Sequence, residues 1–99
     1  MKVSLLVVLL LVSASVVADE AGLKKNNCMA CHAVDKKLVG PAYKAVADKY
    51  RGRSDAADKL AKKIRAGGAG VWGPIPMPAY QQISEIEAKQ LADYILNLK

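Results

Sequence analysis

The apolar positions after residue 18 recur at helical spacing, and no stretch of the chain alternates as a strand does. Start and stop signals divide this pattern into four predicted helices. They run from about Glu20 into the cysteine segment, from Pro41 to Gly52, from Ser54 or Asp55 to Gly67, and from Ser84 to Leu98. No repeat, low-complexity tract or long linker divides the chain, so the sequence predicts one compact all-α domain.

Three of the predicted helices have an apolar stripe that we expect to face the core. The stripes are Tyr43, Val46, Ala47 and Tyr50; Ala57, Leu60, Ala61 and Ile64; and Ala88, Leu91, Ala92, Ile95 and Leu98. Pro41 suits a first helical turn, and Ser84 with Glu87 forms a predicted capping box. Gly67 to Gln82 holds four of the seven glycines and three of the four prolines, which predicts a long loop with a function.

Residues 1–18 have the pattern of a secretory signal peptide. Lys2 precedes an almost unbroken apolar run from Val3 to Leu11, and small residues lead to a cleavage site after Ala18. The run is short for a membrane anchor. The cleavage site has no cysteine, so the sequence does not support a lipoprotein anchor. We therefore expect export to the bacterial periplasm without stable membrane insertion, and a single mature domain of residues 19–99.

The composition of residues 19–99 predicts a thin core, since this segment has no Phe, one Trp and four Tyr. Domains of this size usually need a disulfide, a metal or a cofactor, and a large apolar cofactor would suit this one. Without Lys2, 14 basic residues face 9 acidic ones, a net charge of +5. This charge suits an acidic protein partner or an anionic surface, and it is equally typical of an ordinary basic surface. Nucleic acid is a poor fit, because the basic residues lack interleaved aromatic residues.

The segment Cys28-Met29-Ala30-Cys31-His32 has the spacing of a covalent haem attachment site. Thiols three residues apart on a helical turn lie on one side and can form thioethers with the two vinyl groups of a porphyrin. His32, the only histidine, can then offer an imidazole nitrogen to the iron. A thioredoxin-like pair belongs beside a βαβ pattern, and a closed zinc site needs four ligands where only three Cys and His exist. The sequence therefore predicts one haem c per chain.

The sixth iron ligand decides what such a haem does, because an open position binds gases or peroxide and a filled one favours electron transfer. Met1 leaves with the signal peptide, and Met29 lies in the attachment segment on the side of His32. Met77 remains, in a loop whose prolines fix the backbone. Methionine also fills gaps in cores, but Met77 falls on no helical stripe.

The aromatic residues near these motifs have two possible roles. Trp72 is expected in the core, or with its indole N–H on a haem propionate. Tyr43 and Tyr50 are expected to be core residues first, and a hydrogen bond to a propionate would be secondary.

These residues together resemble the small bacterial class I c-type cytochromes of the c-551/c-552 kind. The similarity spans essentially all of residues 19–99 and is most specific in Cys28–His32, Val39–Tyr43 and Gly70–Pro78. The resemblance implies four short helices wrapped around one haem. It also implies that the Pro41 carbonyl accepts a hydrogen bond from the ring of His32, and that Trp72 donates to a propionate.

The chain departs from the family pattern at two places. Lys63 stands where some relatives have an arginine near the propionates. Relatives often continue after the iron-binding methionine with Pro-Pro and a nearby asparagine, whereas this chain reads Pro78-Ala79-Tyr80-Gln81-Gln82. Gln81 or Gln82 is the candidate donor to the Met77 sulfur.

The leading hypothesis is a monomeric electron carrier, not an enzyme. Its expected donor is a quinol-oxidising complex, and its acceptor a reductase, such as nitrite reductase, or a terminal oxidase. Lysines around an exposed haem edge would favour brief docking to acidic partners; the candidates are Lys36, Lys37, Lys62 and Lys63. The alternatives are a sensor or peroxidase-like haem protein with a labile sixth ligand, and a thiol oxidoreductase with free Cys28 and Cys31.

Overall fold

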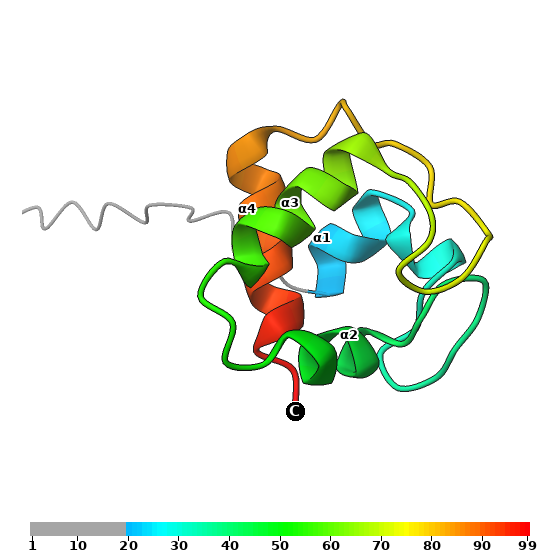
Figure 1. Cartoon of the computed structure of the whole chain (residues 1–99). Helices are drawn as coiled ribbons and strands as arrows, with labels where there is room; N and C mark the ends of the chain where they lie inside the picture. Colours follow the sequence, from blue (N-terminus) through cyan, green and yellow to red (C-terminus); the bar gives the residue numbers. More distant parts are fainter. Residues whose placement is uncertain (1–19) are drawn as a thin grey trace, which may run out of the picture.

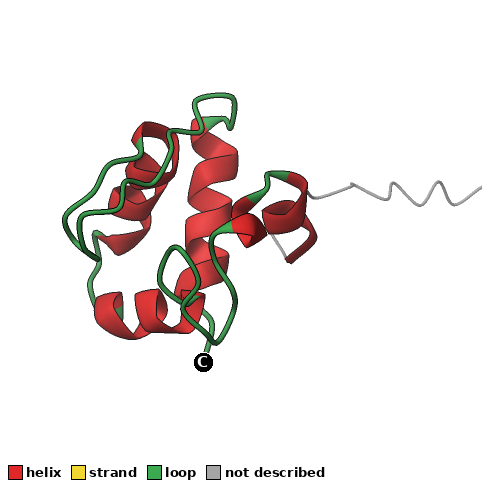
Figure 2. Ribbon diagram, turned by 90° about the vertical axis from the view of Figure 1, so that its right-hand side faces the viewer, coloured by secondary structure: helices red, strands yellow, loops and turns green. Residues whose placement is uncertain are grey.

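Residues 20–99, the part of the chain that the computed structural model describes, form four α-helices and one short 3₁₀-helix (Figures 1 and 2). The elements are α1 (Glu20–Lys25), η1 (Cys28–Ala30), α2 (Tyr43–Tyr50), α3 (Ala56–Ala66) and α4 (Glu85–Leu96). Within this range the chain contains no strand, and its one β-type pairing is an isolated bridge between Gly68 and Met77. The predicted all-α fold is confirmed.

The predicted signal peptide, residues 1–18, lies outside the described residues. Its removal and the domain boundary at Asp19 therefore stay predictions. Among residues 20–99, no helix has both the length and the apolar character that are needed to cross a bilayer.

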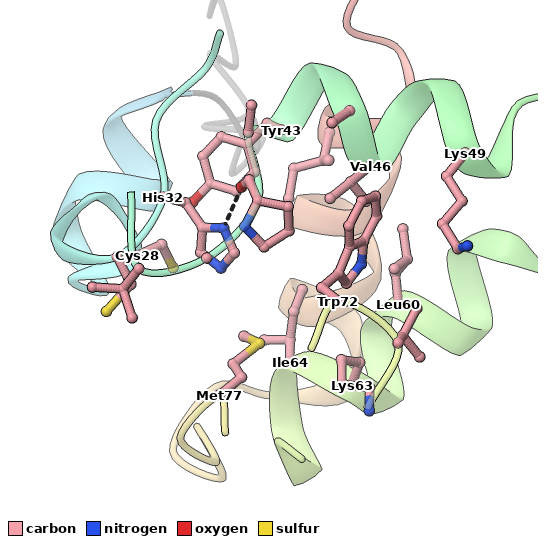
Figure 3. A pocket seen from close by; sticks show the side chains of 18 of the residues that line it. Cys28, His32, Tyr43, Val46, Lys49, Leu60, Lys63, Ile64, Trp72 and Met77 are labelled. Carbon is pink, nitrogen blue, oxygen red and sulfur yellow. Dashed lines mark hydrogen bonds between the residues drawn. The ribbon is translucent and has the colours of Figure 1, made fainter. Parts of the chain in front are cut away.

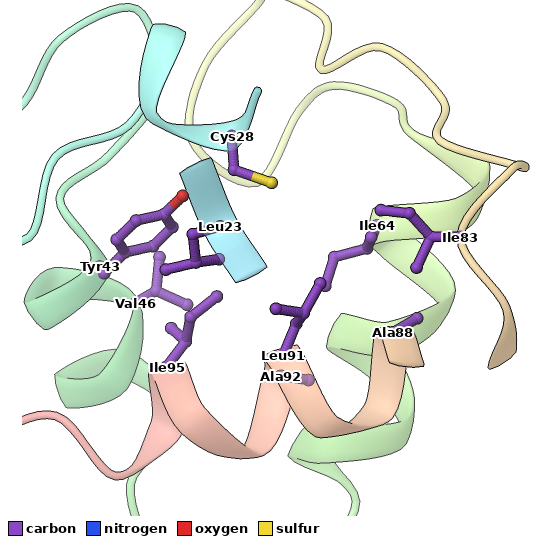
Figure 4. Close-up of a cluster of buried hydrophobic side chains, with 10 residues drawn as sticks. All are labelled: Leu23, Cys28, Tyr43, Val46, Ile64, Ile83, Ala88, Leu91, Ala92 and Ile95. Carbon is purple, nitrogen blue, oxygen red and sulfur yellow. The ribbon is translucent and has the colours of Figure 1, made fainter. Parts of the chain in front are cut away.

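Helix α4 is the centre of the fold, because it packs against both α2 and α3. Its predicted stripe is buried, apart from Leu98, which follows the helix and is half-buried. The core around this stripe is small (Figure 4), and the other elements contribute Leu23, Cys28, Tyr43, Val46, Ile64 and Ile83. Helices α2 and α3 thus rest on one central helix, and both contribute to the cavity described below.

Helix α4 starts at its predicted cap. The Oγ atom of Ser84 accepts a hydrogen bond from the backbone N–H of Glu87 at 3.1 Å. The reciprocal bond of the predicted capping box, from the Ser84 N–H to the Glu87 carboxylate, is not among the hydrogen bonds of residues 20–99. The Glu87 carboxylate accepts a hydrogen bond from the Asn26 side chain at 3.3 Å, which ties the end of α1 to α4. Ile83, only 1% exposed, directly precedes the cap, where an apolar residue commonly packs on the first turn of the helix.

The prediction that the first helix continues into the cysteine segment is wrong. Helix α1 ends at Lys25, and Asn27 adopts a left-handed conformation with φ of 60°. After glycine, asparagine is among the residues that tolerate this conformation best. The Asn26 side chain also donates to the Gly22 carbonyl at 2.8 Å, and this carbonyl accepts the Asn26 backbone N–H at 3.3 Å as well, so both groups close the last turn of the helix. The cysteines therefore begin a separate, tighter turn.

The prediction that Pro41 lies in the first turn of a helix is also wrong, because α2 begins two residues later, at Tyr43. The first two N–H groups of α2 donate to carbonyls of the loop that follows His32, at 2.9 and 3.0 Å. These bonds satisfy donors that a helix start leaves open. The start of α2 is thus fixed by the loop, and the Pro41 carbonyl remains available to another donor.

Helix α3 follows Asp55 and ends at Gly67, as predicted. The Asp55 carboxylate pairs with the Lys59 ammonium at 3.0 Å, and this hydrogen-bonded pair holds the pKa of Asp55 below its ordinary value. The predicted inner face is shifted by one position at its start, since Ala56 is 1% exposed and Ala57 is only half-buried. The other predicted members pack on the core, namely Leu60, Ala61 and Ile64.

A substitution in α4 tests the placement of its buried face. Leu91 is 1% exposed, so Leu91→Ala should lower the free energy of unfolding by about 2–5 kcal/mol through the cavity it leaves. Ile86, on the same helix, is 74% exposed, and Ile86→Ala should change this free energy by less than about 0.5 kcal/mol. Chemical denaturation followed by circular dichroism measures both values. Equal losses in the two variants would contradict the buried face.

Candidate haem-binding site

One large cavity opens between α2, α3 and the segment of residues 67–82, which we call the Met77 loop (Figure 3). Its volume is about 950 Å³, near the upper end of the roughly 300–1,000 Å³ typical of ligand sites. Apolar side chains form most of its walls. All eight residues that the sequence predicts as cofactor or iron contacts line this cavity: Cys28, Cys31, His32, Pro41, Tyr43, Lys63, Trp72 and Met77.

The two cysteines are presented by η1 and the residue after it. The N–H groups of Cys31 and His32 donate to the Cys28 carbonyl at 3.3 and 3.0 Å, which closes a tight turn. Both thiols are free, with Cys28 buried and Cys31 half-buried. Burial raises the pKa of the Cys28 thiol above its ordinary value, so this thiol stays protonated at neutral pH. A low-pKa redox nucleophile would need the opposite shift.

His32 has one ring nitrogen engaged and the other available. Its Nδ1 atom lies 2.7 Å from the Pro41 carbonyl oxygen, as the resemblance implies. Because a carbonyl only accepts, Nδ1 carries the proton and donates it. Nε2 is then the nitrogen with a free lone pair, which is the form that a metal ligand requires. The ring of Tyr43 stacks on the imidazole, with centroids 5.0 Å apart and planes inclined by 24°.

Gly40 supports His32 through a close contact that was not predicted from the sequence. A Cβ atom on Gly40 would lie 2.8 Å from Nδ1 and 3.0 Å from Nε2 of His32, and closer still to Cε1. These short and similar distances place it over the face of the ring. Only glycine allows this approach of the backbone. A glycine directly before Pro41 is the signal that could have revealed it.

Met77 is held by the backbone of its own loop. Its N–H donates to the Gly68 carbonyl at 2.8 Å, and the Gly68 N–H donates back to the Met77 carbonyl at 3.0 Å. Pro76 and Pro78, on either side, have no N–H that could compete. Gly67 has φ of 68°, and a Cβ there would collide with the Met77 carbonyl. Both backbone polar groups of Met77 are therefore fixed.

His32 and Met77 reach the cavity from different elements. Figure 3 shows the imidazole beside α2 and the Met77 sulfur near α3, with space between them. The two residues, together with both cysteines, also line a small adjoining pocket. Met29 packs against the core and lines neither space. Of the methionines in residues 20–99, Met77 alone faces the cavity.

The expected contact between a glutamine and the Met77 sulfur is not present. Gln81 and Gln82 are both exposed, and within residues 20–99 no hydrogen bond joins either side chain to Met77. Tyr80 is the half-buried residue of this stretch, and it lines the small adjoining pocket. The glutamine candidates are therefore wrong in this structure, because the chain turns them toward solvent.

One part of the cavity wall carries positive charge around Trp72. Trp72 is 44% exposed, so the expectation that it lies in the core is wrong, and the Lys49 ammonium lies 5.4 Å from its ring centroid. Lys63 is half-buried on the same wall. Three more cations line the cavity that the sequence did not reveal, namely Lys49, Arg53 and Lys59. Lys49 and Lys63 have no carboxylate partner within residues 20–99.

Tyr43 is a core residue, as expected, with an exposed fraction of 4%. Its hydroxyl has no hydrogen-bond partner among residues 20–99, and burial raises its pKa above the ordinary value. Figure 4 shows this hydroxyl directed toward the segment of Cys28. A hydrogen bond from Tyr43 to a propionate stays a prediction.

These side chains fit a haem c. The cavity offers two thiols for thioethers, an imidazole nitrogen with a free lone pair, a thioether sulfur, apolar walls and unpaired ammonium groups for carboxylates. A metal site built from the protein alone does not fit, because no group of three or more His, Cys, Asp or Glu side chains in residues 20–99 is placed to hold an ion.

The contact between Gly40 and His32 makes a testable prediction. Gly40→Ala should push the imidazole away from the Pro41 carbonyl, because its methyl group would occupy the face of the ring. We expect the hyperfine-shifted proton resonances of His32 in the oxidised, haem-loaded protein to move. Gly22→Ala is the control, since a Cβ there meets only a flexible Leu91 atom at 3.3 Å. Unchanged His32 resonances in Gly40→Ala would contradict the contact.

Comparisons with known proteins agree with this geometry. The family model described as "Cytochrome c" matches residues 20–99. Cytochrome c-552 of Nitrosomonas europaea is 54% identical over 90 residues, covering 91% of this chain and 87% of that protein. Cytochrome c-552 of Hydrogenobacter thermophilus is 52% identical over 99 residues, the full length of both proteins.

A solved structure extends the similarity to three dimensions. The crystal structure of Nitrosomonas europaea cytochrome c552 superposes with a TM-score of 0.79 at 56% sequence identity. The match covers 82% of this chain and the whole of that one. The chain therefore belongs to the cytochrome c family, as a small class I c-type cytochrome of the c-551/c-552 kind, whose members bind covalently attached haem c and act in electron transport.

Proposed function

We propose that this protein is a periplasmic carrier of single electrons with one haem c. In this proposal, Cys28 and Cys31 would form the two thioethers, and His32 and Met77 would bind the iron. The observation that carries it is that an imidazole nitrogen with a free lone pair and a thioether sulfur, both held by backbone bonds, face the same cavity. With both residues bound to the iron, substrates would have no coordination site, which would favour electron transfer over ligand binding.

The bound haem supplies the redox couple, an iron that alternates between its ferric and ferrous forms. The chain's own residues set the donor strength of the iron ligands and, through it, the reduction potential. The Pro41 carbonyl accepts the Nδ1 proton of His32 and makes Nε2 a stronger donor. The Met77 sulfur is a softer donor than a second imidazole and raises the reduction potential relative to two histidines. The largely apolar walls would give the bound haem surroundings of low polarity.

The main alternative is a haem protein with a labile sixth position. The two backbone hydrogen bonds of Met77, at 2.8 and 3.0 Å, argue against it, because they hold the residue at the cavity wall without help from the iron. The thiol oxidoreductase alternative is disfavoured by the raised pKa of Cys28.

We further propose brief docking of acidic redox proteins at the cavity mouth. Exposed apolar side chains lie there, with exposed fractions of 53% for Val39, 50% for Val71 and 64% for Ile75. Lys36 and Lys37 line the same cavity. Lys63 also lines it, whereas Lys62 does not, so the cationic rim that we propose omits Lys62 and includes Lys49. An apolar patch with a charged rim suits weak, rapidly exchanging complexes.

The wider role follows from the export pattern and the family. We propose that residues 1–18 are removed and that residues 19–99 act as a monomer in the periplasm. A membrane quinol-oxidising complex would be the donor, and nitrite reductase or a terminal oxidase the acceptor.

Replacement of Met77 tests the proposal directly. The exported, oxidised protein should have a low-spin c-type spectrum with the weak red band of a sulfur–iron bond. In Met77→Ala this band should vanish, and the reduced protein should bind carbon monoxide rapidly, because no other methionine of residues 20–99 faces the cavity.

Mass spectrometry of the same sample is the control for attachment, since it should give residues 19–99 plus one haem. Met29→Ala is the matched variant, and it should keep the sulfur band. A high-spin haem in the unaltered protein would favour the labile-ligand alternative, and free thiols without haem would favour the thiol alternative.

The docking proposal predicts a local effect of charge. The double variant Lys36→Gln/Lys37→Gln should slow oxidation of the reduced protein by ferricyanide about two- to five-fold at low ionic strength, since the attraction to this anion is lost near the cavity mouth. The control is Lys24→Gln/Lys25→Gln, which removes the same amount of charge from α1. Neither of these two lysines lines the cavity. Stopped-flow kinetics over a salt series measures both. Equal slowing in both double variants would contradict a local rim.

A further inference from the structure

The Met77 loop and α2 meet through one charged contact. The ammonium of Lys49, near the end of α2, lies 5.4 Å from the ring centroid of Trp72, in the Met77 loop. This distance is within the roughly 6 Å at which a cation is attracted to an aromatic face. Figure 3 shows Trp72 extending from the loop toward Val46 of α2, with Lys49 from the same helix beside it.

The other polar contacts of the Met77 loop lead elsewhere. Its N–H groups at Gly67 and Tyr80 donate to α3, at 2.7 and 3.1 Å, and the bonds between Gly68 and Met77 lie within the loop. Arg65 of α3 donates to the carbonyl of Ile83, just beyond the loop, at 2.9 Å. Among the hydrogen bonds, ion pairs and ring contacts of residues 20–99, the contact of Lys49 with Trp72 is the one that joins the loop to α2.

Both partners are available for this role. Lys49 has no carboxylate within ion-pair distance in residues 20–99, although Arg51 on the same stretch pairs with Asp48 at 3.0 Å. Trp72 is 44% exposed, and its neighbour Val71 is 50% exposed, so burial holds this part of the loop only weakly. The attraction between the Lys49 ammonium and the indole face therefore stabilises a contact that apolar packing alone holds weakly.

We propose that Lys49 is a positioning residue, which holds the Met77 loop against α2 through Trp72 and so slows the release of Met77 from the iron. Met77 can leave only if its loop moves away from the cavity. Because Met77 and Gly68 are bonded to each other, the stretch between them, which carries Trp72, is expected to open together with Met77. The Lys49 contact opposes that opening. The inference rests on the proposed ligation by Met77.

The test measures how often the loop opens. Cyanide can bind the ferric iron only after Met77 has left, so its rate of binding, followed by loss of the sulfur band, reports loop opening in the haem-loaded protein. Lys49→Met removes the charge and keeps a side chain of similar length. We expect it to bind cyanide about two- to five-fold faster, the range that corresponds to an exposed cation–π contact.

Two variants separate the contact from charge alone. Lys49→Arg keeps a cation over the indole and should retain the rate of the unaltered protein. Lys44→Met removes a charge from the same helix, where Lys44 neither lines the cavity nor contacts Trp72, and it should also leave the rate unchanged. Denaturant unfolding of each variant checks that a faster rate does not come from global destabilisation.

A second measurement does not depend on the iron. Amide hydrogen exchange at Gly70 and Met77, two N–H donors within the loop, should be faster in Lys49→Met and unchanged at the buried α4 residue Leu91. Unchanged cyanide binding and unchanged loop exchange in Lys49→Met would overturn the proposal, and so would an equal acceleration in Lys44→Met. A missing sulfur band in the unaltered protein would overturn the ligation by Met77 instead, and loop exchange would then decide the role of Lys49.

Discussion

The hydrogen bond between His32 and the Pro41 carbonyl, 2.7 Å long, sets the arrangement of one whole side of the cavity. It fixes which imidazole nitrogen carries the proton, and it brings the backbone at Gly40 onto the face of the ring. Two carbonyls of the loop after His32 accept hydrogen bonds from the first N–H groups of α2, so the helix starts where the loop ends. Tyr43, the first residue of α2, stacks on the same imidazole. One side chain thus links the attachment segment, the loop and α2.

The opposite side of the cavity is held by different means. No side chain of residues 20–99 hydrogen-bonds to the Met77 sulfur, and the residue is placed by its own backbone through the bridge with Gly68. Because the flanking prolines restrict φ, the loop needs few contacts to keep its shape. The result is asymmetric, since His32 is oriented through its ring and Met77 through its main chain. A loop of this kind can open without unfolding α3 or α4, which carry half of the ten core residues.

Local patterns explain which features could be predicted from the sequence. The stripe of α4 and the cap at Ser84 depend on residues within one or two turns, and both are found where predicted. The eight site residues also meet at one cavity, because the attachment motif and the proline-rich loop are specific over short stretches. Two features that the sequence did not reveal involve residues farther apart in the chain. Pro41 lies outside α2 because the carbonyls of the loop after His32 accept hydrogen bonds from the first N–H groups of the helix and so fix where it begins. The contact of Lys49 with Trp72 joins positions 23 apart in the chain, which no periodicity reveals.

The distribution of charge follows the same division between structure and site. The five ion pairs of residues 20–99 involve largely exposed side chains, and such pairs contribute little to stability in water. The core of this fold therefore depends on apolar packing around α4 and not on its charges. Lys49 and Lys63, which stay outside these pairs, both line the cavity. An unpaired ammonium beside a large apolar cavity can form an ion pair with an anionic group or a cation–π contact with an aromatic ring. Six of the fourteen Lys and Arg side chains of residues 20–99 line the cavity, where the carboxylates of a haem would meet them.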